Sequence, residues 1–124
     1  MQAMTQPPGD RAFFLRKSGD IERVKKTGRR LPTPLFNLVS CRSDMPHARV
    51  GVIVGKRLGG AVIRNRAKRR FRELARLVRG RLTPGQDLLV FPRQGALEAT
   101  PSALREAWLT ALRRQALVRD PEGQ

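Results

Sequence analysis

The stretch ARVGVIVGKRLGGAVIRNRAKRRFRELARLVRG, residues 48–80, joins two segments of different hydrophobic period through a glycine-containing loop. In residues 48–55, valines alternate with glycine and isoleucine, which is the spacing of a β-strand with small residues on one face. Residues 56–60 contain paired glycines, and apolar side chains recur at helical spacing through residues 61–79. The stretch therefore predicts a strand, a tight loop and a long helix in direct succession.

The predicted helix divides into an apolar stripe and a broad basic face. On a helical wheel, an arc of about 80° holds the apolar side chains Ile63, Ala67, Phe71, Leu74 and Val78. Roughly the next 140° holds Arg64, Asn65, Lys68, Arg69, Arg72, Arg76 and Arg79. Solvated helix faces usually mix signs, because each like-charge pair costs a few tenths of a kcal/mol, roughly. This face carries one acidic residue, Glu73, so it favours a polyanionic partner over a plain solvated surface.

Composition supports a polyanionic partner and limits the other possibilities. The 124 residues suit one domain, and a net charge of +16 is typical of proteins that bind nucleic acid. The single cysteine, Cys41, permits no internal disulfide, and with the single histidine, His47, it cannot form a Cys/His zinc site. The sequence has neither an apolar run of membrane-spanning length nor the apolar core of a secretory signal. We therefore expect a cytoplasmic protein without a membrane partner.

The segments before residue 48 are shorter and less regular. We interpret residues 1–14 as a flexible leader. Ser18 is expected to cap a helix that ends at Gly28. Residues 35–40 predict a strand, which could pair with residues 48–55 as an antiparallel hairpin.

The remaining segments complete a small α+β domain. Residues 86–92, QDLLVFP, predict another strand, and Thr100 followed by Pro101 predicts the start of a final helix. We expect a single RNA-binding domain over residues 15–119 and a frayed tail over residues 120–124. The expected fold is a two-layer α/β sandwich with about four strands and helices packed on the sheet.

The Gly59–Gly60 pair precedes the long helix and stands beside Lys56 and Arg57. Backbone amides at a helix start, together with two cations, could hold a phosphate. The glycines could equally serve a tight turn, and both interpretations stay open. Asn65 offers a donor and an acceptor for a base edge or a 2′-hydroxyl.

One stretch of the sequence resembles the signature of a known protein family. Residues 49–74 are similar to the signature of the bacterial ribonuclease P protein subunit: R-V-G, a strand ending in K-[KR], then G-x-A-V-x-R-N-R-x-K-R-x-x-R-E. A weaker resemblance begins at residues 15–30 and continues to the last helix. It implies an α/β sandwich with a left-handed βαβ crossover that carries the basic helix.

The resemblance also implies a function. Such a subunit joins a catalytic RNA, which removes the 5′ leader of precursor tRNA with Mg²⁺, and no further protein partner is required. The positions expected to contact RNA are Lys56, Arg57, Arg64, Asn65, Arg66, Lys68, Arg69, Arg72 and Arg76. The positions expected to line a leader cleft between the sheet and the first helix are Ile21, Lys25, Phe36 and Val39. The family commonly has aromatic residues at these positions, and three of the four are not aromatic here: only Phe36 is retained.

Protein-borne catalysis is not expected. His47 lies in a predicted turn without an obvious base partner, and Cys41 has no clear activating neighbour. No paired carboxylates suit two-metal chemistry, and metal positions are not predictable. The alternatives are a structural ribosomal protein and a basic DNA-binding protein, and the R-N-R-x-K-R run favours the ribonuclease P subunit over both.

Overall fold

The computed structural model describes residues 9–119. Its helices and strands are α1 (Asp10–Phe13), α2 (Ser18–Thr27), β1 (Arg29–Pro32), β2 (Phe36–Arg42), β3 (Arg49–Val52), the 3₁₀ turn η1 (Lys56–Leu58), α3 (Ala61–Leu77), β4 (Gln86–Pro92), α4 (Gln94–Glu98) and α5 (Pro101–Arg114). The strand, loop and helix expected over residues 48–80 are confirmed as β3, η1 and α3.

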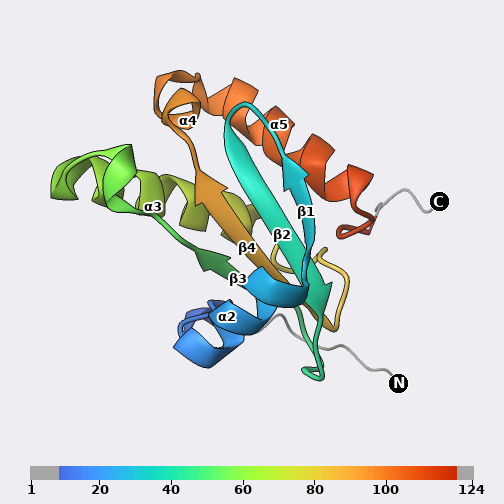
Figure 1. Ribbon diagram of the computed structural model, residues 1–124. Coiled ribbons are helices and arrows are strands. Elements are labelled where there is room, and N and C mark those ends of the chain that lie inside the picture. The colour runs from blue at the N-terminus through green and yellow to red at the C-terminus, as the bar shows by residue number, and fades with distance from the viewer. Residues whose placement is uncertain (1–8, 120–124) are drawn as a thin grey trace.

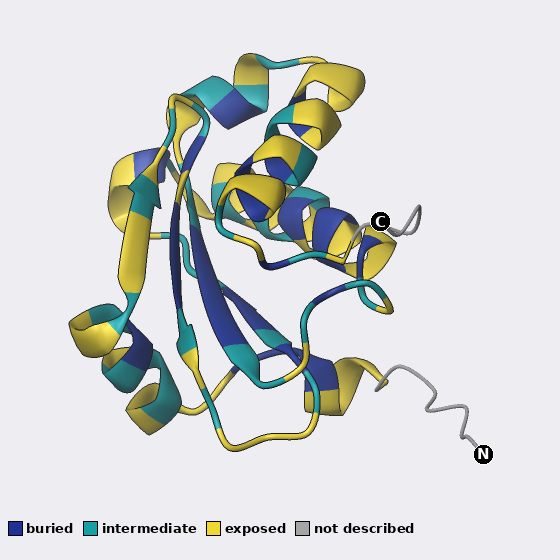
Figure 2. Cartoon of the chain, turned by 90° about the vertical axis from the view of Figure 1, so that its right-hand side faces the viewer, coloured by how far each residue is buried: buried dark blue, intermediate teal, exposed yellow. Residues whose placement is uncertain are grey.

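The four strands form one mixed sheet in the order β1-β2-β4-β3. β2 is antiparallel to both neighbours, whereas β3 and β4 are parallel and α3 connects them. Helices α3 and α5 cover one face of the sheet, and α2 lies on the other (Figure 1 and Figure 2). The expected α+β sandwich, its four strands and a βαβ crossover are confirmed.

One predicted strand pairing is wrong. Residues 35–40 and 48–55 do not form a hairpin, because β4 lies between β2 and β3. β2 instead pairs with β1, which was not predicted. β1 has the sequence RRLP and a single half-buried apolar residue, Leu31, so it lacks the alternation that reveals a strand. Its place at the sheet edge tolerates Pro32.

The predicted leader is too long. Residues 10–13 form α1, and the side chains of Phe13 and Phe14 are buried in the main core. The Leu15 amide donates to the Val50 carbonyl at 2.8 Å, so the chain crosses the β3 edge of the sheet here. Residues 1–8 and the predicted tail 120–124 lie outside the described residues.

The main core lies between the sheet and the pair α3 and α5. Phe36, Phe71 and Trp108 meet edge to face, with ring centroids 5.7 to 6.4 Å apart. The Trp108 indole donates to the Leu74 carbonyl at 3.0 Å, which links α5 to α3. The predicted cap of α5 is confirmed, because Thr100 accepts from the Ala103 amide at 3.1 Å.

The apolar stripe of α3 is confirmed except at its first residue. Ala67, Phe71, Leu74 and Val78 are buried, but Ile63 is 38% exposed and packs beside Gly59. Ser18 does not cap α2 as expected. It is the first residue of that helix, the residue before it has no capping side chain contact, and Gly28 follows its end as predicted.

Candidate nucleic-acid interface

Every residue expected to contact RNA lies on η1 or α3, and none is buried. Asn65, Arg66 and Arg69 are exposed on α3, whereas Arg64 and Lys68 are half-buried. We define the α3 basic surface as Lys56, Arg57, Arg64, Asn65, Arg66, Lys68 and Arg69. Within residues 9–119, no carboxylate lies within ion-pair distance of these side chains.

The turn into α3 requires glycine at position 59. Gly59 has a φ of 149°, a left-handed conformation that favours glycine, and Gly60 stands at the N-cap of the helix. The Arg64 guanidinium donates to the Gly59 carbonyl at 3.2 Å and so reinforces the turn. The turn interpretation is confirmed, and the phosphate interpretation stays a prediction.

The other end of α3 contacts the N-terminal segment. Arg76 donates to the Asp10 carboxylate at 3.0 Å, and Arg79 also pairs with it. Hydrogen bonds from Arg76 and then Arg79 lower the pKa of Asp10 to about 2. The same Asp10 hydrogen bond raises the pKa of Arg76. Asp10 thereby neutralises part of the predicted RNA-binding face.

Two aromatic rings reinforce this contact. The guanidinium carbon of Arg79 lies 4.8 Å from the centre of the Phe13 ring, and those of Arg72 and Arg76 lie 5.8 and 5.4 Å from that of Phe14. Arg72 and Arg76 therefore differ from the residues of the α3 basic surface, because their guanidinium groups already contact the N-terminal segment. This N-terminal clamp was not predicted from the sequence, because its partners Asp10 and Arg76 are 66 positions apart.

A groove of about 600 Å³ begins beside the α3 basic surface and continues onto the sheet. It is lined by Asn37, Ile53, Gly55, Lys56, Arg57, Leu58, Phe91, Pro92, Arg93 and Gln94. Asn37, Ile53 and Phe91 lie on the sheet face that α2 only partly covers. A half-buried aromatic ring next to three cations suits a single-stranded nucleic acid.

The residues predicted for the leader cleft do not line this groove. Phe36 is fully buried on the opposite face of the sheet, and Val39 is 1% exposed beneath α2, so both predictions are wrong. Ile21 is half-buried against the core under α2, and Lys25 pairs with Glu22 at 3.7 Å. The aromatic residue of the groove is Phe91, which is half-buried near the end of β4.

Buried Asp87 on β4 holds α2 against the sheet. Its carboxylate accepts from Arg49 Nε at 2.9 Å and Nη2 at 2.8 Å, and it pairs with Arg23 of α2. Asp20 pairs with Arg49 at 3.5 Å. These hydrogen bonds to Asp87 raise the pKa of both arginines.

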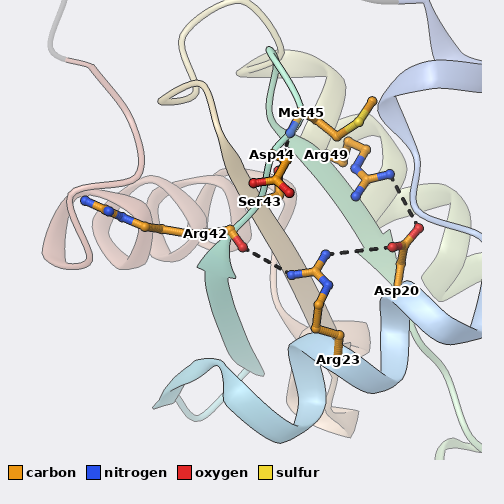
Figure 3. A pocket seen from close by; sticks show the side chains of 7 residues that line it. All are labelled: Asp20, Arg23, Arg42, Ser43, Asp44, Met45 and Arg49. Atoms are coloured by element: carbon orange, nitrogen blue, oxygen red, sulfur yellow. Dashed lines mark hydrogen bonds and ion pairs between the residues drawn. The ribbon is translucent and has the colours of Figure 1, made fainter.

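A pocket of about 390 Å³ opens beside this network (Figure 3). Arg23 and Arg49 point toward Asp20 there, and the Arg42 side chain extends away (Figure 3). The lining combines cations with carboxylates, so its charge is largely compensated within the protein.

The residues weighed for catalysis have structural contacts. His47 Nε2 lies 3.1 Å from the Ala12 carbonyl, and Cys41 Sγ accepts from Arg23 at 3.2 Å. Within residues 9–119, no group of three or more His, Cys, Asp or Glu side chains is placed to hold a metal ion. In the same part of the chain, every helix is too short or too polar to cross a membrane.

Comparisons with known proteins agree on one family. The family model "Ribonuclease P" matches residues 10–116. The ribonuclease P protein component of Syntrophobacter fumaroxidans is 47% identical over 83 residues, which cover 66% of this chain and 70% of that protein. Its counterpart from Chloroflexus aggregans is 40% identical over 113 residues, which cover 90% of this chain and 84% of that protein.

Two solved structures show the same fold. An RNase P protein of Staphylococcus aureus, a mutant described as defective in mRNA degradation activity, superposes with a TM-score of 0.80 at 28% identity, covering 87% of this chain and 92% of that one. The RNase P protein of Thermotoga maritima gives 0.73 at 31% identity, covering 81% and 94%. This chain therefore belongs to the ribonuclease P protein component family.

Proposed function

We propose that this chain is the protein subunit of a bacterial ribonuclease P and binds the catalytic RNA through the α3 basic surface. Membership in the family implies association with the ribonuclease P RNA and a role in tRNA processing. We further propose that the holoenzyme removes the 5′ leader of precursor tRNA by endonucleolytic cleavage. It would act in the cytoplasm, and it would need neither a membrane nor a second protein.

The observation that carries the proposal is the uncompensated charge of the α3 basic surface. Its cations lie within reach of no described carboxylate, so their mutual repulsion is unrelieved in the free protein. RNA phosphates relieve it, and counterions released from the RNA drive binding. Exposed Asn65 lies among these cations, and its amide oxygen can accept a hydrogen bond from a 2′-hydroxyl, which arginine cannot do.

The groove beside η1 suits the single-stranded leader. Lys56 and Arg57 belong to both the groove and the α3 basic surface, so one strand could follow both. Phe91 offers a ring on which a base could stack, and Asn37 lies opposite it on β2 in the sheet register. A stacked base contributes about 1–3 kcal/mol to binding.

The chemistry is assigned to the RNA. Because the described side chains form no metal-binding cluster, we propose that Mg²⁺ is held by phosphates of the catalytic RNA and the substrate. The chain supplies binding and position: it concentrates the substrate on the RNA and neutralises phosphate repulsion. In this assignment the holoenzyme is the endoribonuclease and the protein alone does not cleave.

A reconstitution tests the proposal. Purified protein, the matching catalytic RNA and a precursor tRNA are mixed at low Mg²⁺ and physiological salt. We expect accurate 5′ cleavage that depends on the protein, and none from the protein alone.

Two variants locate the surface. Arg66→Gln/Arg69→Gln should lose most of the stimulation, whereas Arg11→Gln/Arg105→Gln should keep it, although it removes the same charge from exposed positions elsewhere. Equal losses in both variants would show that net charge, and not the α3 basic surface, causes the effect.

A further inference from the structure

Five arginines lie around the end of α5, which contacts the start of β1 at the sheet edge opposite β3. We define the β1–α5 edge as Arg29, Arg81, Arg113, Arg114 and Arg119. Arg29 begins β1, whereas Arg113 and Arg114 end α5. Figure 2 shows this side of the molecule, where β1 and the last turn of α5 are exposed.

Backbone contacts bring these residues together from distant parts of the sequence. The Arg29 guanidinium donates to the Gln115 carbonyl at 3.0 Å, which joins the start of β1 to the end of α5. The Arg119 amide donates to the Arg81 carbonyl at 2.8 Å, and its guanidinium contacts the Gly80 carbonyl at 3.4 Å. The cluster is thus built by the fold and is not a run in the sequence.

The fold does not compensate this charge. Among residues 9–119, no carboxylate lies within ion-pair distance of the five guanidinium groups. Glu106 precedes Arg113 by about two helical turns. Arg81 Nε and Gln115 Oε1 are buried, and within the described residues neither has a hydrogen-bond partner. Such positions cost stability unless a ligand or another contact offsets them.

The β1–α5 edge is separate from the α3 basic surface. Along the axis of α3, residue 66 lies about 16 Å from the last residue of the helix, Leu77. Between the two surfaces, Asp10 neutralises Arg76 and Arg79. The β1–α5 edge and the α3 basic surface share no residue and are built on different elements.

We propose that the β1–α5 edge is a second contact surface for the phosphodiester backbone of RNA. Arginine presents a planar fork of donors that matches phosphate oxygens, and all five cations here are arginine. A lipid surface would require apolar side chains among the cations, but the large exposed apolar residues found within residues 9–119 are Met45, Val62, Ile63 and Leu77, none of them at this edge. This inference rests on the proposed function and adds a second footprint to it.

The test uses Arg113→Gln/Arg114→Gln, since within residues 9–119 neither side chain makes a hydrogen bond or ion pair that the fold needs. The matched control is again Arg11→Gln/Arg105→Gln, and thermal melting verifies that both variants are folded. One arm measures binding to the catalytic RNA, and the other measures binding of precursor tRNA to the assembled holoenzyme.

We expect about tenfold weaker binding than the control in one arm, with a salt slope lower by about 1 to 2. A deficit in the first arm identifies the catalytic RNA as the source of the phosphates, and one in the second identifies the substrate. Equality with the control in both arms overturns the inference. Failure of the proposed function is seen separately, because the unmodified protein would then not stimulate cleavage.

Discussion

Asp87→Asn tests how α2 is held over the sheet. Asp87 is fully buried and neutralises Arg49, whose side chain is 16% exposed, together with Arg23, whose side chain is 37% exposed. Asparagine keeps one acceptor but removes the buried charge, which leaves Arg49 only its longer ion pair with Asp20 at 3.5 Å. Breaking a buried pair costs about 3–5 kcal/mol, and the lower value applies because Arg23 can be rehydrated.

We therefore expect a loss of about 3 kcal/mol in the free energy of unfolding, which lowers Tm by roughly 10 °C. Urea unfolding measures the loss. Asp44→Asn is the matched control, because it removes the same charge from an exposed residue that lines the neighbouring pocket, and it should change stability by less than about 0.5 kcal/mol. If the two variants lose equal stability, the Asp87 network does not hold α2 in place.

Three further predictions address other parts of the molecule. Asp10→Asn should strengthen RNA binding and steepen its salt dependence, because it releases the arginines that Asp10 pairs with. In the unmodified protein the pKa of Asp10 is about 2, below its unfolded value of 3.8, so the ion pairs of Asp10 stabilise the fold above about pH 4 and this stability is lost as the pH falls toward 2. Hydrogen exchange at the Phe14 amide measures that loss. Gly51→Ala should cost about 1–3 kcal/mol, because its Cβ would stand 2.7 Å from Leu89 Cδ2, whereas Gly55→Ala meets nothing within 4 Å and should melt like the unmodified protein. Phe91→Ala should weaken holoenzyme binding of precursor tRNA by about 1–3 kcal/mol and leave binding of leaderless tRNA unchanged; an equal loss for both RNAs would remove Phe91 from the leader site.

Much of the fold was predictable because its periodicities are strong. The alternation before η1, the stripe of α3 and the Thr100–Pro101 start of α5 each specify one element locally. The strand order was not predictable from these signals. β2 and β3 are neighbours in sequence, but β4, which follows α3 in the chain, lies between them in the sheet. This strand order depends on the packing of the whole sheet against its helices.

The candidate site was also predictable only where its residues lie close together in the sequence. The residues of the α3 basic surface could be grouped from the sequence, because one helix brings them together at known spacing. The cleft residues were not, because Phe36 and Val39 are three apart on β2 and so lie on opposite faces, and both are covered by helices. The clamp of Asp10 on Arg76 joins residues 66 positions apart, which no local pattern indicates.

The central claim is that the α3 basic surface binds RNA phosphates. The most direct measurement is the salt dependence of binding between the purified protein and its catalytic RNA, compared between Arg66→Gln/Arg69→Gln and Arg11→Gln/Arg105→Gln. We predict that the first variant lowers the slope of log affinity against log salt by about 1 to 2, while the second keeps the slope of the unmodified protein. An unchanged slope in the first variant, with the fold intact, would contradict the claim.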